Sequence, residues 1–241
     1  MTADEKYFEL LIPMLKKAHD AQRAQLEEAA QRIAACVSGS GMVYTFGTGH
    51  AHLLSEEIFY RAGGLARVCP ILDERLMLHV SAGESSEWER EEGIAAQVMA
   101  RYPVKAGDVI LIFSNSGRNA APVEMALLAR QKGMFSIALT SLNHSKSAIP
   151  RSSCGKRLFE VCDLILDNMG VVGDAVVKTS SDSFVSPTST VVGAAILQSI
   201  VARVAELTAG KAEFFVSSNV DGGDAVNEKL IQKYKPDIMC L

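Results

Sequence analysis

A run of five apolar residues at positions 109–113 constrains the fold of this chain more than any other feature. A strand with one face in water would carry a polar residue at every second position. This run has none, and is therefore typical of a strand buried on both faces of a parallel sheet. A turn at residues 105–108 precedes it. A Ser-rich loop and a helix predicted over residues 120–132, closed by Gly133, follow it.

Four more apolar segments alternate with helical patterns along the chain. They predict strands at residues 42–46, 67–72, 135–139 and 163–166, with helices between them. Such alternation predicts an α/β fold with an open, doubly wound, parallel sheet of five strands. Ligands of these folds bind beyond the carboxyl ends of the strands, so the turns that follow the strands are where a site is expected.

Apolar residues also recur at helical spacing before the first strand, over residues 5–36. They predict one long helix or two, with Pro13 as a kink or break. These helices pack either on a second subunit, as a homodimer or homotetramer, or on their own domain. We divide the chain into a helical segment (1–39), an α/β domain (40–210) and a tail (211–241) with a short strand and a helix over residues 222–233.

Composition argues against several classes of protein. The 24 Lys and Arg and 28 Asp and Glu residues give a net charge of −4 without basic runs, so no nucleic-acid partner is expected. Five cysteines without a Cys-x-x-Cys pair favour reduced thiols in the cytoplasm, and the first residues lack a signal-peptide layout. Gln198, Arg203 and Glu206 interrupt the apolar stretch 189–207, which predicts a core helix and no membrane partner.

The first strand runs into a glycine turn, Gly47-Thr48-Gly49, followed by His50 and His52. Glycines let a backbone approach a ligand, and the helix that follows favours an anion at its N-terminus. The third glycine of a dinucleotide fingerprint is missing at the expected spacing. The alternative is a tight turn with no ligand.

The central strand runs into a second turn, Ser114-Asn115-Ser116-Gly117, which ends at Asn119 and opens a helix. Hydroxyl and N–H donors at a helix N-terminus suit a phosphate group. No Gly-Lys-Ser/Thr sequence is present, which excludes a nucleotide P-loop. The alternative is that one Ser caps the helix while the other faces solvent.

Two more hydroxyl clusters follow on the predicted ligand edge, and we assign them to ligand binding as well. Thr140 and Ser141 come directly after the fourth strand, and a second cluster begins the apolar helix. Capping accounts for one hydroxyl of the second cluster but not for all of them. The residues assigned there are Ser186, Thr188 and Ser189.

Together the glycine turn, the Ser-x-Ser-Gly turn and residues 187–190 before a long apolar helix resemble the SIS (sugar isomerase) domain over residues 40–208. The resemblance implies a flavodoxin-like three-layer sandwich that binds a phosphorylated sugar. The N-terminal helices look most like those of stand-alone family members such as the phosphoheptose isomerases and an uncharacterised SIS branch. The resemblance also implies an aldose–ketose isomerase without an organic cofactor. The alternatives are a non-catalytic phosphosugar-binding module and an amino-sugar-phosphate lyase or etherase.

Isomerisation through an enediol needs a carboxylate base and an acid, often a histidine. The helix after the glycine turn offers Glu56 or Glu57 as base and His52 or His50 as acid. The catalytic Glu of the SIS family, counted from the glycine turn, falls near Arg61, which cannot act as a base. The alternative for Glu56 and Glu57 is a solvated helix face.

A metal site formed by His50, His52 and His79 with Asp73 or Glu74 is an alternative use of the histidines. These residues lack the compact spacing of metal ligands, so no metal site is predicted. His144 is expected to be exposed in a loop. Asp174 is a candidate for sugar hydroxyls if its segment folds back. The acidic residues around Trp88, from Glu84 to Glu91, are expected to be a solvated helix start.

Overall fold

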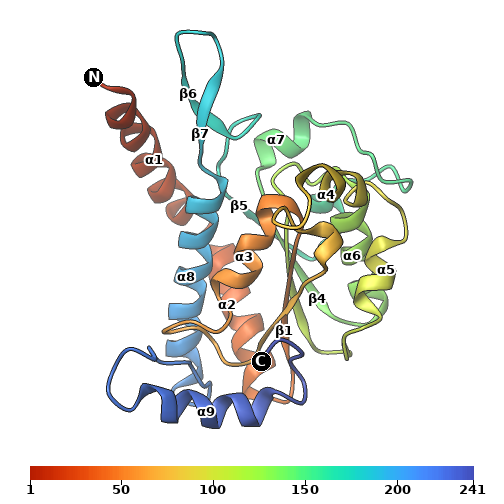
Figure 1. Cartoon of the computed structure of the whole chain (residues 1–241), viewed down its shortest axis with the longest axis vertical. Coiled ribbons are helices and arrows are strands. Elements are labelled where there is room, and N and C mark those ends of the chain that lie inside the picture. The colour runs from red at the N-terminus through yellow and green to blue at the C-terminus, as the bar shows by residue number, and fades with distance from the viewer.

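The computed structural model describes residues 1–241 and contains the predicted parallel sheet of five strands (Figure 1). Its strand order is β2-β1-β3-β4-β5, the flavodoxin-like order. The α/β class and the five strands predicted from the sequence are confirmed. The strands are β1 (Val43–Gly47), β2 (Val68–Ile71), β3 (Val109–Phe113), β4 (Phe135–Thr140) and β5 (Leu164–Asp167).

Alternation along β3 divides the interior into two cores. Val109, Leu111 and Phe113 face the first core, and Ile110 and Ile112 face the second. All five residues are buried because helices cover both faces of the sheet, as the uninterrupted apolar run predicts. The molecule is therefore a three-layer sandwich.

Different helices cover the two faces of the sheet. The first core contains residues of α1 (Ala3–Asp20), α2 (Arg23–Ser38), α3 (His52–Glu57) and α8 (Ser189–Thr208). The second contains residues of α5 (Ile94–Met99), α6 (Ala120–Gln131) and α9 (Gly223–Tyr234). Two short helices, α4 (Ala82–Trp88) and α7 (Leu142–Ser147), lie toward the end of the molecule where the strands finish (Figure 1).

Helix α2 is part of the first core. Leu26, Ala29 and Ile33 are buried there with residues of β1, β3 and α8, so the core is continuous across the division placed at residue 39. Pro13 lies inside α1 and does not end it. The chain breaks instead at Ala21–Gln22, where the buried Gln22 side chain donates to the carbonyls of Ala18 (2.6 Å) and Asp167 (2.7 Å).

A β-hairpin absent from the sequence predictions projects beside α1 (Figure 1). Its strands are β6 (Ala175–Lys178) and β7 (Phe184–Pro187). Of its eight strand residues only Val177 is buried, so the hairpin carries little of the apolar alternation by which a strand is recognised in a sequence. In the tail, Phe214 forms an isolated bridge with Leu65 where a short strand was predicted, and α9 forms within one residue of its predicted bounds.

Helix α8 is long and apolar enough to cross a membrane by length and composition alone. One such helix is weak evidence for a membrane span, since core helices of soluble proteins also meet these criteria. Here Val192, Leu197 and Val204 of α8 are buried in the first core, as expected for a core helix. Three 3-10 turns complete the structure: η1 (Gly49–Ala51), η2 (Glu74–Leu76) and η3 (Leu158–Glu160).

Candidate functional site

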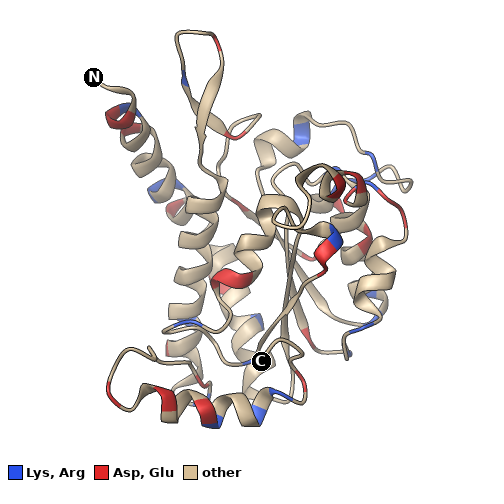
Figure 2. Cartoon of the chain, viewed as in Figure 1, with Lys and Arg blue, Asp and Glu red and all other residues tan.

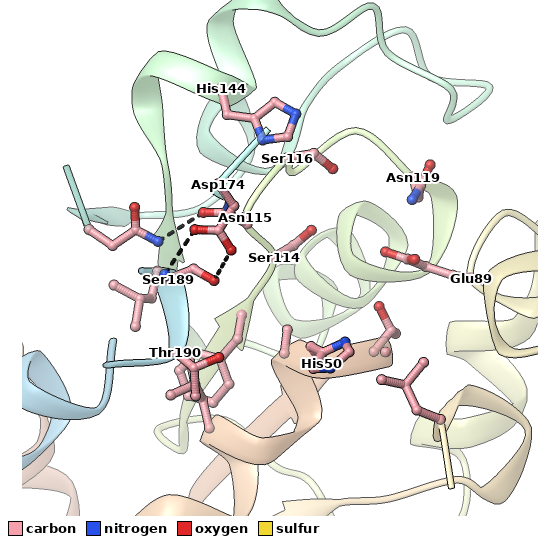
Figure 3. Close-up of a pocket in the computed structure, with 18 of the residues that line it drawn as sticks. His50, Glu89, Ser114, Asn115, Ser116, Asn119, His144, Asp174, Ser189 and Thr190 are labelled. Carbon is pink, nitrogen blue, oxygen red and sulfur yellow. Dashed lines mark hydrogen bonds between the residues drawn. The ribbon is translucent and has the colours of Figure 1, made fainter. Parts of the chain in front are cut away.

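A cavity of about 330 Å³ opens at the carboxyl ends of β1, β3 and β4 (Figure 3). The strand order reverses direction between β1 and β3, and this switch point is where ligands of doubly wound folds bind. The cavity contains most of the two turns predicted to bind ligand. The predicted residues that line it are Thr48, Gly49, His50, Ser114, Asn115, Ser116, Asn119 and Ser189.

The glycine turn forms one wall of the cavity. Gly47 ends β1, and a Cβ there would collide with the backbone of Ala51 and His52. Gly49 has φ +56°, a left-handed conformation that glycine adopts without strain. The glycines thus allow the chain to turn sharply into η1, which places His50 on the cavity wall while Gly47 lies behind it.

The Ser-x-Ser-Gly turn presents unused donors to the cavity. The backbone N–H groups of Ser116, Arg118, Asn119 and Ala120 donate to no acceptor in the chain, and no side chain caps α6. The Ser114 hydroxyl accepts from the Gly117 N–H (3.1 Å), and the Ser116 hydroxyl has no partner. Gly117 supports this geometry with φ +57°. The open N-terminus of α6 is therefore suited to an anion.

Helix α7 brings an unpredicted residue, His144, to the cavity. Its Nδ1 atom is buried and has no hydrogen-bond partner, and Figure 3 shows the ring above Ser116. The expectation that His144 is exposed in a loop is therefore wrong. The Ser141 hydroxyl caps α7 by accepting from the His144 N–H (3.2 Å). The sequence shows this cap only as a Ser three residues before the His.

Thr140 and Ser141 support the cavity without lining it. The Thr140 hydroxyl donates to the Asn115 carbonyl (3.1 Å), and the Ser141 hydroxyl donates to the Gly170 carbonyl (2.7 Å). Both residues are fully buried. The Thr140 bond holds the Ser-x-Ser-Gly turn against the end of β4, and the Ser141 bond holds the segment that follows β5, so neither hydroxyl lines the cavity.

A carboxylate already occupies the N-terminus of α8. Asp174 folds back, as the sequence allowed, and its Oδ1 accepts from the N–H groups of Thr188 (3.1 Å) and Ser189 (2.9 Å). Its Oδ2 accepts from the Ser189 hydroxyl. Thr188 is buried behind the wall and Ser186 lies outside the cavity on β7, so only Ser189 of the three predicted residues lines it.

The carboxylates predicted as the base lie outside the cavity. Glu57 is bonded to Arg61 and to Gln198, whose Nε2 donates to Oε1 (3.0 Å). Glu56 faces buried His52, with 3.6 Å between His52 Nε2 and Oε1. His52 Nδ1 is engaged with the Gly49 carbonyl (2.5 Å). Of the four predicted catalytic residues the structure brings only His50 to the cavity.

Glu89 supplies a carboxylate that the sequence analysis missed. It follows α4 directly, and its backbone carbonyl accepts from the Ala121 N–H at the start of α6 (3.1 Å), which ties it to the cavity. Its side chain points into the cavity and forms no hydrogen bond or ion pair within the chain (Figure 3). The acidic run around Trp88 conceals it in the sequence. The one feature of the sequence that could have indicated Glu89 is its position on the segment that follows strand β2.

Outside the cavity, two carboxyl groups, Glu124 and Glu92, lie beside each other. Glu124 of α6 accepts from the Gly93 N–H (2.9 Å to each oxygen) and lies beside Glu92, which accepts from Ser153. Burial and the neighbouring Glu92 raise the pKa of Glu124 to about 7. The pair lies outside the cavity. No group of three or more His, Cys, Asp or Glu side chains is placed to hold a metal ion.

Comparisons with known proteins agree with this architecture. A family model described as SIS domain matches residues 6–141, a range that covers most of α1, all of α2 and both predicted turns, and ends directly after β4. A UPF0309 protein of Listeria monocytogenes is 42% identical over 239 residues, covering 98% of this chain and 97% of the relative. A UPF0309 protein of Shouchella clausii is 43% identical over 243 residues and covers 99% of both chains.

Solved structures share the fold at low identity. A phosphoheptose isomerase from Francisella tularensis superimposes with a TM-score of 0.56 at 16% identity, covering 86% of this chain and all of the other. The sugar isomerase domain of an RpiR transcription factor from Sphaerobacter thermophilus also gives a TM-score of 0.56, at 13% identity, covering 95% of this chain and 98% of the other. The family model and the UPF0309 relatives together establish that the chain belongs to the SIS family of phosphosugar-binding domains, among the UPF0309 proteins.

Proposed function

We propose that this protein binds a sugar phosphate in the cavity and interconverts its aldose and ketose forms. The observation that carries the proposal is the Glu89 carboxylate, which is free of partners and lies in the same cavity as the open N-terminus of α6. The cavity therefore contains the two groups that the reaction needs, a carboxylate base and a binding site for the phosphate.

The phosphate is assigned to the α6 end of the cavity. Two helix N-termini flank the cavity, and Asp174 already occupies that of α8. A second anion there would be repelled, whereas the N–H groups of Ser116, Arg118, Asn119 and Ala120 at the start of α6 have no acceptor. No Lys or Arg lines the cavity, so a phosphate there would be bound by neutral donors, among them these N–H groups, the Ser116 hydroxyl, the Asn119 amide and His144.

Ser116→Ala is expected to weaken the binding of a sugar phosphate roughly 10- to 100-fold, the effect of losing one hydrogen bond to a charged group. Binding of the unphosphorylated sugar should not change. Isothermal titration with glucose 6-phosphate and glucose measures both. Ser86→Ala is the matched control, because Ser86 also lines the cavity but its hydroxyl donates to the Ala82 carbonyl (3.3 Å). Equal affinity of wild type and Ser116→Ala for glucose 6-phosphate would contradict the assignment of the phosphate to the start of α6.

Glu89 then has the role first given to Glu56 or Glu57. It takes the proton from C2 of the open-chain aldose while the C1 carbonyl oxygen receives a proton, which leaves an enediol. Returning the proton from Glu89 to C1, while the C2 hydroxyl loses its own, gives the ketose. His50 lines the same cavity and is the residue we assign to the oxygen protons.

Exchange of the C2 hydrogen with solvent tests the activity. An isomerase incorporates deuterium from D2O into a bound substrate at C2, and NMR detects this even when the net conversion is small. A panel of aldose and ketose phosphates that bind with Ser116-dependent affinity but exchange no hydrogen would instead support a binding module. Products lacking a substituent of the sugar would support elimination.

We further propose that the protein is a homodimer joined through α1 and the β6–β7 hairpin. These elements lie side by side beyond the sheet, joined by a hydrogen bond from the Tyr7 hydroxyl to the Pro187 carbonyl (3.0 Å) (Figure 1). Large apolar side chains are exposed on both, with Phe8 at 59%, Ile12 at 60% and Phe184 at 57% of full exposure. Surface this apolar usually marks a protein interface.

Phe8→Glu combined with Ile12→Glu is expected to convert the dimer to a monomer, because each carboxylate would lose its water on association. Sedimentation velocity of the full chain measures the change. Lys16→Glu on the same helix is the control and should leave the dimer intact. A monomeric wild type, or a dimer or tetramer that survives both substitutions, would contradict the proposed interface.

We also propose a cytoplasmic location. None of the five cysteines is paired, and burial raises the pKa of Cys36 to about 11 and that of Cys69 to about 12, so both thiols stay protonated and unreactive. Fractionation of cells that express the protein tests this, and recovery outside the cytoplasm would overturn it.

A further inference from the structure

Two arginines, Arg118 and Arg151, meet at the start of α6 outside the cavity lining, and Arg90 lies close enough to Arg151 to affect its pKa. Arg118 belongs to the turn before α6, Arg151 to the loop after α7, and Arg90 to the segment after α4. The Arg151 N–H donates to the Arg118 carbonyl (2.8 Å), and Arg151 Nη1 donates to Asn119 Oδ1 (3.3 Å). These bonds fix the Arg151 loop directly on the start of α6.

The charge of this cluster is not balanced within the chain. No carboxylate lies within 4.0 Å of Arg90, Arg118 or Arg151, whereas Arg75 and Arg101 share Asp73, and Arg203 is paired with Glu27 and Glu206. The Arg118 guanidinium, with burial and Arg90, lowers the pKa of Arg151, and Glu89 opposes this only in part. Like charges are thus held together without a counter-ion.

One donor of the cluster is buried and unused. Arg118 Nε has no acceptor and almost no contact with solvent. A buried donor without a partner costs about 1–3 kcal/mol, and more when it is charged. The nearby acids do not supply the acceptor, because Glu89 points into the cavity and Glu92 is bonded to Ser153 (2.7 Å to its N–H). Figure 2 shows both acidic and basic residues in the region around α4 and α7.

The three arginines are separate from the donors at the start of α6 that we assign to the phosphate. None of the three arginines lines the cavity, while Asn119 does and lies between the two. Its Oδ1 accepts from Arg151, and its Nδ2 has no partner. A group bound by the arginines would therefore lie one side chain beyond a ligand in the cavity.

We propose that Arg90, Arg118 and Arg151 form a second anion site, at the rim of the cavity, that binds a phosphoryl or carboxylate group. Planar guanidinium groups bind both groups through paired hydrogen bonds. The group is either a second anionic substituent of the cavity ligand or a separate small anion. Only the first of these sources rests on the proposed function.

Inorganic phosphate tests the site on the full chain. By NMR titration, wild type is expected to show two binding events. Ser116→Ala should weaken binding at the start of α6 and leave binding at the arginines unchanged. Arg151→Gln should weaken binding at the arginines at least tenfold. Arg151 is exposed, so its substitution should not disturb folding. Lys156→Gln, an equal loss of charge in the same loop, is the control. If the affinity for phosphate at the rim is unchanged by Arg151→Gln, or is weakened equally by Lys156→Gln, the proposed arginine site is wrong.

Glucose 1,6-bisphosphate and glucose 6-phosphate separate the two sources. If the second group belongs to the same ligand, the bisphosphate binds at least tenfold more tightly and Arg151→Gln removes the difference. If the anion is separate, both sugars bind alike and phosphate still binds at the rim. Failure of Ser116→Ala to affect any ligand counts against the proposed function, whereas failure of Arg151→Gln counts against the rim site alone.

Discussion

Glu89→Gln is expected to lower turnover of the sugar phosphate by about 10²–10⁴-fold while the ligand still binds, because the amide keeps the shape of the side chain but cannot accept the C2 proton. Deuterium incorporation at C2 and isothermal titration with the same ligand measure the two quantities. Glu89 forms no hydrogen bond or ion pair, so its substitution should leave the thermal unfolding temperature unchanged. The loss would then be chemical and not structural.

Two other carboxylates provide matched controls. Glu91→Gln removes the same charge two residues away, and Glu56→Gln removes the carboxylate that faces His52 outside the cavity. Neither should change turnover by more than a few-fold. Full activity in Glu89→Gln together with loss of activity in Glu56→Gln would contradict the role of Glu89. It would show that the base is Glu56, as the sequence predicted.

Phe113→Ala is expected to cost about 3–5 kcal/mol of the free energy of unfolding, the range for removing a large aromatic side chain from a core. Phe113 is 0% exposed in the first core and also lines the cavity. For a chain of 241 residues this lowers Tm by roughly 6–20 °C. Calorimetry measures the change. The cavity left behind adjoins the site, so ligand binding should weaken as well.

Phe113→Leu separates size from the aromatic ring. It keeps most of the buried volume and should cost less than about 1.5 kcal/mol. A cost below about 1 kcal/mol for Phe113→Ala would mean that the end of β3 collapses around the deletion, and that the cavity is less rigidly held than its buried walls indicate.

The sheet and its turns could be predicted from the sequence because their signals are local. The apolar run at 109–113 has no polar position, so it had to be buried on both faces. Gly47 marks a turn that a side chain would obstruct, and Gly49 and Gly117 mark turns with positive φ. Strand ends in a parallel sheet meet at one edge, which brought the Gly-Thr-Gly and Ser-x-Ser-Gly turns into one cavity.

The catalytic assignment could not be made this way, because it depends on where side chains point. Glu56 and Glu57 are near the cavity in sequence, yet α3 aims them at His52, Arg61 and Gln198. Glu89 is far from every motif, and a single backbone bond to Ala121 brings it to the wall. Helix direction and long-range contacts decide such positions, and neither has a local signature.

The sequence by itself thus determined the five strands of the sheet and the two turns at its carboxyl edge, because burial and backbone conformation are properties of short segments. Only the tertiary structure decided which of these groups face a ligand. It placed Asp174 on the N-terminus of α8, left that of α6 open, and brought Glu89, His144 and the arginines of the rim to the two sides of one wall. Those contacts join residues far apart in the chain, and packing alone brings them together.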